Sequence, residues 1–137
     1  MFFLGKKPKP SGSAPTTAQR RGQAAEDQAL AYLQAQGLRL LARNYQVPGR
    51  AGGEIDLILQ ESDGTAVLVE VRSRSSSDFG GAGASIGAAK QRKLAQAAQH
   101  WLLTSGHTGA WRFDAVLIDG SSNGAALQWV RGAFDAA

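Results

Sequence analysis

The segment from Gly53 to Arg74, GEIDLILQESDGTAVLVEVRSR, decides the fold of this 137-residue chain. Its first part, 54–60, alternates between apolar and polar side chains, which is typical of a β-strand and places three apolar residues on one face: Ile55, Leu57 and Leu59. Asp63-Gly64 predicts a tight turn. The run that follows, 66–71, is apolar on both faces before Glu70, which is typical of a central strand covered on both sides. We therefore expect a hairpin at the centre of a sheet.

The flanking sequence predicts two helices and three further strands. Ala25, Ala29 and Leu33 recur at helical spacing, so a helix is expected from about Ala18 to Gln36. A second helix is expected to begin at Ser85 as its N-cap and to run to about Leu103. The expected fold class is α/β (α+β), with a mixed central sheet of about five strands flanked by helices. The order is α-β-β-β-α-β-β, and the remaining strands are expected at 38–47, 111–118 and 125–130.

Composition limits the class of protein. The chain is long enough for one domain with its own core, and it has no cysteine, which excludes disulfide frameworks, thiolate metal sites and cysteine nucleophiles. The formal net charge is +4, but residues 1–21 hold five basic residues and no acidic one. The other ten basic and all eleven acidic residues follow, so the rest of the chain carries −1. The basic excess therefore belongs to the N-terminal region and does not by itself indicate nucleic-acid binding.

The N-terminal leader, 1–17, is rich in Lys, Pro, Ser and Gly, which predicts a disordered basic arm ahead of a folded domain at 18–137. Its apolar run, 2–4, is too short for a signal peptide. No later run reaches the roughly 18 apolar residues of a membrane span. We therefore expect a cytoplasmic protein that makes no membrane contact.

Two carboxylates carry the strongest chemical signal. Asp56 lies on the first strand of the predicted hairpin and Glu70 on the second, so strand pairing brings their side chains toward each other. Two carboxylates a few ångströms apart repel each other, and a buried carboxylate between Val69 and Val71 carries a desolvation cost. Mg²⁺ prefers sites of this kind, with one or two carboxylates and otherwise water and phosphate as ligands. The pattern therefore predicts an oxygen-ligated Mg²⁺ (or Mn²⁺) site.

Two further charged residues border the apolar faces of the predicted helices. Glu26 lies beside the apolar stripe of the first helix, and Lys90 lies within that of the second. Each also has an ordinary structural interpretation, as a glutamate at a helix flank and as a lysine whose stem covers apolar surface. In the same way, Asp56 suits the solvent face of an alternating strand, and Glu70 with Arg72 suits an exposed ion network.

Other motifs are weaker. GASIG at 83–87 matches the GxSxG pattern of serine hydrolases, but that fold needs a strand directly before the motif and a histidine after the acidic member of the triad. Both histidines, His100 and His107, precede Asp114 and the later acidic residues. A helix N-cap is therefore the better interpretation of the serine in this motif, and two such histidines make no zinc site.

Several blocks together resemble one family. The blocks GEIDLI (53–58) and VEVRSR (69–74) lie at the separation found in the bacterial YraN family, uncharacterised protein family 0102. The resemblance covers about 21–134, nearly the whole expected domain, and leaves the leader outside it. The supporting matches are Gly22 and Glu26 in the first helix, Arg43-Asn44, Phe79-Gly80, Lys90, Arg112-Phe113-Asp114 and Ala133-Phe134.

The YraN family is similar to the PD-(D/E)xK nucleases, particularly the archaeal Holliday-junction resolvases. This resemblance implies a restriction-endonuclease-like core in which Asp56 and Glu70 ligate Mg²⁺, with a contribution from the Val71 carbonyl. Glu26 would complete or surround that site. The implied activity is that of a metal-dependent, nuclease-like protein acting on DNA, branched or structured DNA included, through a metal-activated water.

One position departs from the superfamily pattern, which has a lysine two residues after the glutamate. That residue is Arg72 here, which stays protonated and cannot act as a general base, although it can orient water or stabilise charge on a phosphate. Lys90 from the second helix would then supply the amine. The alternative function is a non-catalytic nucleic-acid-binding module that keeps the nuclease fold.

Contacts with nucleic-acid phosphates are expected from four basic residues: Arg50, Arg74, Arg92 and Lys93. Solvated surface charge is the ordinary interpretation of such residues, above all for the two on the second helix. The analogy with resolvases further implies a homodimer, because two nicks need two sites.

Overall fold

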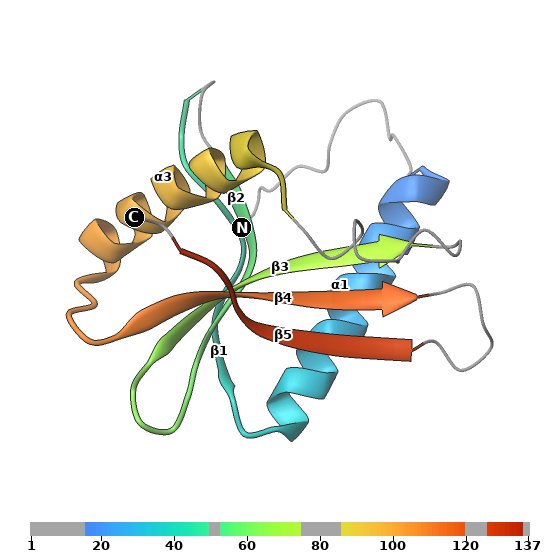
Figure 1. Ribbon diagram of the computed structural model, residues 1–137, viewed down its shortest axis with the longest axis horizontal. Helices are drawn as coiled ribbons and strands as arrows, with labels where there is room; N and C mark the ends of the chain where they lie inside the picture. The colour runs from blue at the N-terminus through green and yellow to red at the C-terminus, as the bar shows by residue number, and fades with distance from the viewer. Residues whose placement is uncertain (1–15, 50–52, 75–85, 120–125, 136–137) are drawn as a thin grey trace, which may run out of the picture.

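The computed structural model describes residues 16–49, 53–74, 86–119 and 126–135, with the backbone alone at 17–19, 21 and 74. In these ranges the chain forms two helices and five strands in the predicted order (Figure 1). Residues 1–15, which make up nearly all of the predicted leader, lie outside the described residues. The elements are α1 (Thr17–Ala35), β1 (Arg39–Gln46), β2 (Glu54–Gln60), β3 (Ala66–Arg74), α3 (Ala88–Ser105), β4 (Trp111–Asp119) and β5 (Ala126–Phe134).

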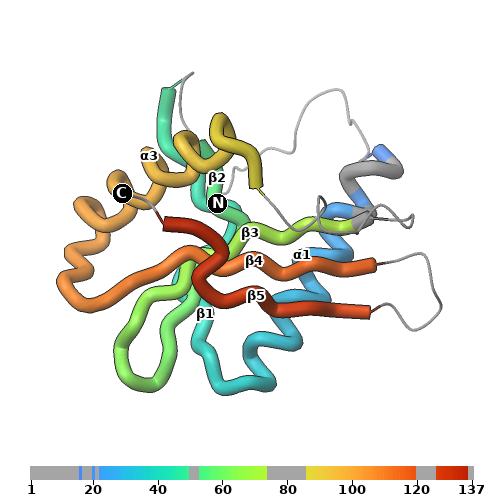
Figure 2. The backbone as a smooth tube through the Cα atoms, in the orientation of Figure 1, coloured from blue at the N-terminus to red at the C-terminus, as the bar shows by residue number. Residues whose placement is uncertain are grey.

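The five strands form one mixed sheet, which confirms the predicted α+β fold. The strands lie in chain order from β1 to β5, and every neighbouring pair is antiparallel except β3 and β4, which are parallel. A parallel pair needs a long crossover connection, and α3 lies in that connection. Figure 2 shows β3, β4 and β5 side by side, with β5 at the edge of the sheet.

Each face of the sheet packs against one helix, so there are two hydrophobic cores. β3 supplies Val67 and Val69 to the α1 core and Ala66 and Leu68 to the α3 core. These side chains are fully buried, which confirms the prediction of a central strand covered on both faces. The buried helical side chains are Ala25, Ala29 and Leu33 on α1 and Leu94, Ala97, Ala98 and Trp101 on α3.

The structure corrects two details of the sequence prediction. The helix α3 begins at Ala88 with Gly87 as its N-cap, so the prediction of an N-cap at Ser85 is wrong, and Ser85 itself lies outside the described residues. Ile55 also does not share a face with Leu57, because Ile55 packs in the α3 core and Leu57 in the α1 core. The strand alternation is interrupted opposite Asn44 of β1, whose backbone is left-handed (φ +53°).

A buried ion network joins β4 to β5. Asp114 is fully buried and accepts hydrogen bonds from Arg112 Nε (2.9 Å), Trp129 Nε1 (2.8 Å) and the Gly132 N–H (3.0 Å). Arg112 also donates to Glu61 at 2.9 Å, and this hydrogen bond is the main cause that raises the pKa of Arg112. The network therefore gives Arg112 and Asp114 a structural role, tying the edge strand to the end of β2.

Gly53 packs directly against α3 where β2 begins. A Cβ on Gly53 would lie 2.5 Å from the carbonyl oxygen of Lys93, closer than real contacts allow. We expect Gly53→Ala to lower the free energy of unfolding by about 1–3 kcal/mol, because the helix backbone must shift to make room. Urea denaturation measures this change. Gly22→Ala, at an exposed helical position with open space around it, is the control and should be neutral or stabilising.

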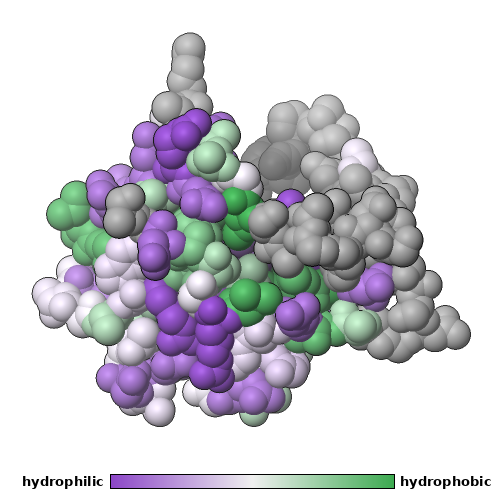
Figure 3. All heavy atoms as spheres, viewed as in Figure 1, coloured by the Kyte–Doolittle hydropathy of each residue, from purple (hydrophilic) through white to green (hydrophobic). Residues whose placement is uncertain are grey.

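Neither helix in the described ranges is both long enough and apolar enough to cross a membrane. On the face shown in Figure 3, hydrophobic residues occur in separate groups with hydrophilic residues between them. Hydrophilic residues gather in the upper part of that view and again in its lower centre.

Candidate functional site

The site lies where β2 and β3 separate. The two strands pair regularly from Gln60 with Ala66 to Leu57 with Val69. The next residue of β2 is Asp56, whose carboxylate accepts a hydrogen bond from the backbone N–H of Val71 at 2.8 Å. The Asp56 side chain therefore bonds to β3 where a backbone hydrogen bond would otherwise continue the pairing. The two strands diverge from this point, beside Glu70.

Negative charge gathers around Asp56. Burial and the neighbouring carboxylate of Glu70 raise the pKa of Asp56 to about 7, with smaller contributions from the carboxylates of Glu26 and Glu54. The hydrogen bond from Val71 acts in the opposite direction. Carboxylates from α1, β2 and β3 therefore lie close enough to Asp56 to raise its pKa.

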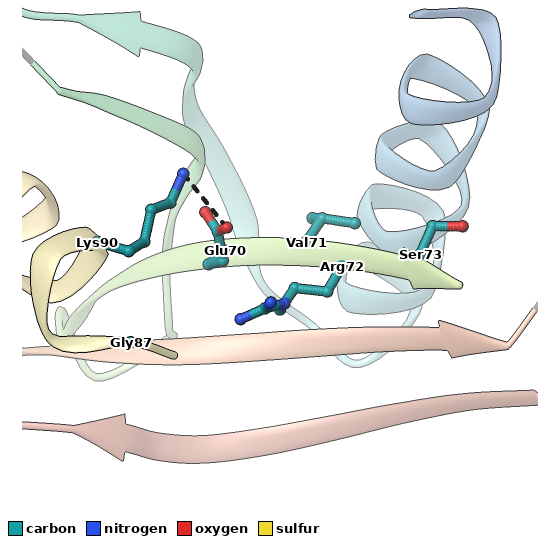
Figure 4. A pocket seen from close by; sticks show the side chains of 6 residues that line it. All are labelled: Glu70, Val71, Arg72, Ser73, Gly87 and Lys90. Atoms are coloured by element: carbon teal, nitrogen blue, oxygen red, sulfur yellow. Dashed lines mark ion pairs between the residues drawn. The ribbon is translucent and has the colours of Figure 1, made fainter. Parts of the chain in front are cut away.

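Glu70 is the buried member of this group. One of its oxygens, Oε2, lies 3.5 Å from the Nζ of Lys90 on α3, and the other, Oε1, is buried without a hydrogen-bond partner among the described residues. The Glu70 side chain is 11% exposed and that of Lys90 is 48% exposed. Lys90 therefore extends from α3 to one oxygen of the carboxylate, as Figure 4 shows, and leaves Oε1 without a partner among the described residues.

A pocket of about 370 Å³ opens beside this ion pair. Arg72 lines it two residues after Glu70 on β3, while Val71 and Ser73 extend in the opposite direction, toward α1 (Figure 4). The pocket also reaches Gly87, the N-cap of α3, where the helix dipole favours an anion. Two cationic side chains and a helix N-terminus thus face the same space as a buried carboxylate.

Glu26 and Asn44 form the other side of the site. The Nδ2 of Asn44 donates to Glu26 Oε1 at 3.1 Å and to Glu54 Oε2 at 3.3 Å. Arg43 also lies 3.5 Å from Glu26 and donates a hydrogen bond to Asp27 at 2.6 Å. The sequence patterns predict no site role for Asn44 or Glu54. The Arg43-Asn44 block of the family resemblance was the only available signal for Asn44.

Four basic residues are predicted to bind phosphates, and the two whose side chains are described, Arg92 and Lys93, do not line the pocket. Arg92 and Lys93 are exposed on α3, in the two positions that follow Gln91. Arg74 ends β3, one pleat beyond Arg72, and only its backbone is described. Arg50 lies outside the described residues. The structure therefore places Arg92 and Lys93 on the surface of the helix that carries Lys90.

The donor set fits one hard divalent cation. Asp56 and Glu70 repel each other, and Glu70 Oε1 is a buried oxygen without a partner, so a cation would satisfy both conditions. No group of three or more His, Cys, Asp or Glu side chains in the described ranges is arranged to hold a metal ion. A cation here would therefore have two protein carboxylates, and water, backbone or substrate oxygens would complete its coordination. Glu26 instead contacts Asn44 and Arg43.

The fold and the site define a class: an α+β domain whose mixed sheet carries a buried glutamate, a partly buried aspartate and a lysine at the point where two central strands diverge. The particular family follows from comparison with known proteins. The chain belongs to the family described as Uncharacterised protein family UPF0102, whose model matches residues 25–118. This confirms the family resemblance drawn from the sequence blocks.

Relatives match along the whole chain. A UPF0102 protein of Acidovorax sp. (strain JS42) is 62% identical over 138 residues, covering 100% of both chains. One of Paracidovorax citrulli is 60% identical and covers 99% of both chains. One of Verminephrobacter eiseniae is 52% identical and covers 98% of this chain and 96% of its own. The family name describes no activity, so function has to be argued from the site.

Proposed function

We propose that this protein is a divalent-metal-dependent nuclease that hydrolyses phosphodiester bonds in DNA, branched or structured DNA included. The observation that carries the proposal is the buried, unpartnered Oε1 of Glu70 beside Asp56 and Lys90. A buried carboxylate oxygen that lacks a hydrogen-bond partner is costly, and binding a ligand would remove that cost. The restriction-endonuclease-like core, the Mg²⁺ or Mn²⁺ cofactor and a cytoplasmic location all belong to this proposal.

The side chains divide the chemistry between them. Asp56 and Glu70 would hold the cation, which lowers the pKa of a bound water and stabilises charge on the scissile phosphate. Arg72 stays protonated, so it donates hydrogen bonds to phosphate oxygens rather than accepting a proton. Lys90 supplies an amine within 3.5 Å of Glu70, where it orients water or stabilises charge at the reacting phosphate.

The substrate class follows from the surroundings of the pocket. A phosphate group suits the N-terminus of α3 together with Arg72 and Lys90. Arg92 and Lys93 on the same helix extend this cationic surface and add salt-dependent attraction to the DNA backbone. A homodimer would supply the two sites needed to nick two strands of a branched substrate.

Cleavage assays with the full chain test this proposal. Linear, flapped and four-way DNA are incubated with the protein in Mg²⁺, Mn²⁺ or EDTA, and products are separated on denaturing gels. We expect cleavage in Mg²⁺ or Mn²⁺ and none in EDTA. Absence of cleavage on every substrate with both metals would contradict the enzymatic proposal.

The arginine at position 72 favours one second candidate, a nucleic-acid-binding module that keeps the fold without cutting. Superfamily nucleases carry a lysine at that position, and an arginine cannot replace it as a base. The two candidates differ in their response to EDTA. A binding module retains DNA affinity in EDTA and after Glu70→Ala, whereas the nuclease loses cleavage in both cases.

Lys90 gives a prediction that separates catalysis from binding. We expect Lys90→Ala to lower the cleavage rate about 10²- to 10³-fold, because a cationic group is lost beside the reacting phosphate. The fold should persist, since the Lys90 side chain is half exposed. Gln99→Ala is the control and should retain nearly all activity, because it removes an exposed polar side chain of α3 that does not line the pocket. Equal cleavage rates for the two variants would show that Lys90 has no role in the reaction.

A further inference from the structure

Asn44 has an unusual backbone. Its φ is +53°, and it is the only non-glycine residue with a positive φ in the described ranges. Side chains other than glycine seldom adopt this conformation, although asparagine tolerates it better than most. Residues held in such a conformation occur preferentially where function requires them. Asn44 lies directly opposite Asp56, between the pairs Arg43 with Leu57 and Tyr45 with Ile55.

The left-handed residue coincides with a break in the alternation of side chains along β1. Arg43 and Tyr45 are two residues apart, so regular alternation would place both side chains on one face. Arg43 instead reaches Asp27 on α1, and the Tyr45 hydroxyl makes a hydrogen bond with His100 on α3. The regular alternation of side chains between the two faces of the sheet is therefore interrupted at Asn44.

The side-chain amide of Asn44 lies between two carboxylates, those of Glu26 and Glu54. A single Nδ2 carries two hydrogens, and they go to Glu26 on α1 and Glu54 on β2, at 3.1 and 3.3 Å. Both acceptors belong to the carboxylate group around Asp56. An uncharged donor joins two like charges without cancelling either one. A lysine or arginine in the same position would neutralise the negative field that attracts a cation.

We infer that Asn44 is a positioning residue that holds the Glu26 and Glu54 carboxylates around the divalent-cation site at Asp56 and Glu70. This inference rests on the proposed function, because it assigns Asn44 a role toward that cation. Glu26 and Glu54 would act on the cation through their negative charge rather than as its ligands, and removal of groups outside the ligand set typically changes metal affinity 10- to 100-fold. The role is carried by the amide, and the strained backbone delivers the amide to its two acceptors.

Titration calorimetry of the full chain with Mn²⁺ tests the inference without relying on activity. We expect Asn44→Gly to weaken Mn²⁺ binding at least about 10-fold, since glycine accepts the positive φ but lacks the amide. Asn44→Ala lacks the same amide and keeps a β-carbon, so it should weaken binding to a similar degree. Gln46→Ala, which removes an exposed amide from the same strand, should bind Mn²⁺ like the wild type. Circular dichroism checks the fold of each variant.

The outcomes separate the inference from the proposed function. Wild-type affinity in Asn44→Gly would overturn the role of Asn44 and leave the cation site standing. Weakening in Asn44→Ala alone would also overturn it, because backbone strain rather than the amide would then be responsible. Failure of the wild type to bind Mn²⁺ would overturn both the cation site and the role of Asn44.

Discussion

Asp56→Asn is expected to lower the rate of DNA cleavage at least about 10³-fold, because the variant loses one of the two carboxylates that would hold the cation. The fold should remain intact. An asparagine has nearly the same shape, and its side-chain oxygen can still accept the hydrogen bond that Val71 donates to Asp56 at 2.8 Å. Glu70→Gln should have the same effect on cleavage. Single-turnover assays with saturating Mg²⁺ measure the rate.

The same variant should be more stable than the wild type in the absence of metal. Burial and the Glu70 carboxylate raise the pKa of Asp56 to about 7, well above its value in an unfolded chain. The folded state therefore holds the proton more tightly, and the wild type loses stability as the pH rises from about 4 to about 7. The asparagine side chain does not titrate, so above pH 7 Asp56→Asn should gain about 1–2 kcal/mol, and this gain should disappear toward pH 4.

Asp63→Asn is the matched control for both measurements. It makes the same chemical change in the same hairpin, but Asp63 is exposed in the turn and bonds to the Thr65 N–H. Its cleavage rate should equal that of the wild type. Wild-type cleavage by Asp56→Asn would show that the activity lies elsewhere or belongs to a contaminant. A loss of stability in Asp56→Asn at pH 8 would contradict the repulsion between the two carboxylates.

Asp114→Ala is expected to lower the free energy of unfolding by about 3–5 kcal/mol, the largest effect on stability that we predict. Asp114 is fully buried, and its loss would leave the donors of Arg112, Trp129 and Gly132 without their acceptor. Unpaired buried donors carry the full cost of desolvation. For a domain of this size, the midpoint of thermal unfolding should fall by about 10 °C or more.

Glu61→Gln provides the comparison at the other end of the network. Glu61 also bonds to Arg112, but its side chain is partly exposed, so the change should cost only about 1 kcal/mol or less. Folded Asp114→Ala at low temperature should still bind Mn²⁺, because Asp114 lies outside the candidate site. A change of less than about 1 kcal/mol in Asp114→Ala would contradict the structural role of this network.

Local patterns were sufficient to predict the elements. Alternation in 54–60, a turn at Asp63-Gly64 and an apolar run before Glu70 depend on neighbours only a few residues apart, and the structure confirms the strands they predict. The buried faces of both helices follow from the same local spacing. Strand pairing through a short turn likewise brings Asp56 and Glu70 to one place.

The rest of the candidate site depends on contacts that no local pattern encodes. Asn44 has a left-handed backbone and reaches Glu26 on α1 and Glu54 on β2, which are 18 and 10 residues away in the sequence. Ile55, which pairs with Tyr45, packs in the opposite core from the one that alternation predicts. The ion pair between Lys90 and Glu70 likewise depends on where α3 crosses the sheet.

The amino-acid sequence by itself determined which segments form strands and helices, which side chains are buried on the central strand, and the family to which the chain belongs. Only the tertiary structure decided that Glu70 keeps an unsatisfied buried oxygen and that the Arg112–Asp114 pair is structural. The physical reason is the distance along the sequence over which each effect acts. Propensity and hydrophobic periodicity act over a few residues, whereas desolvation and repulsion between charges depend on residues that folding brings together from α1, β2, β3 and α3.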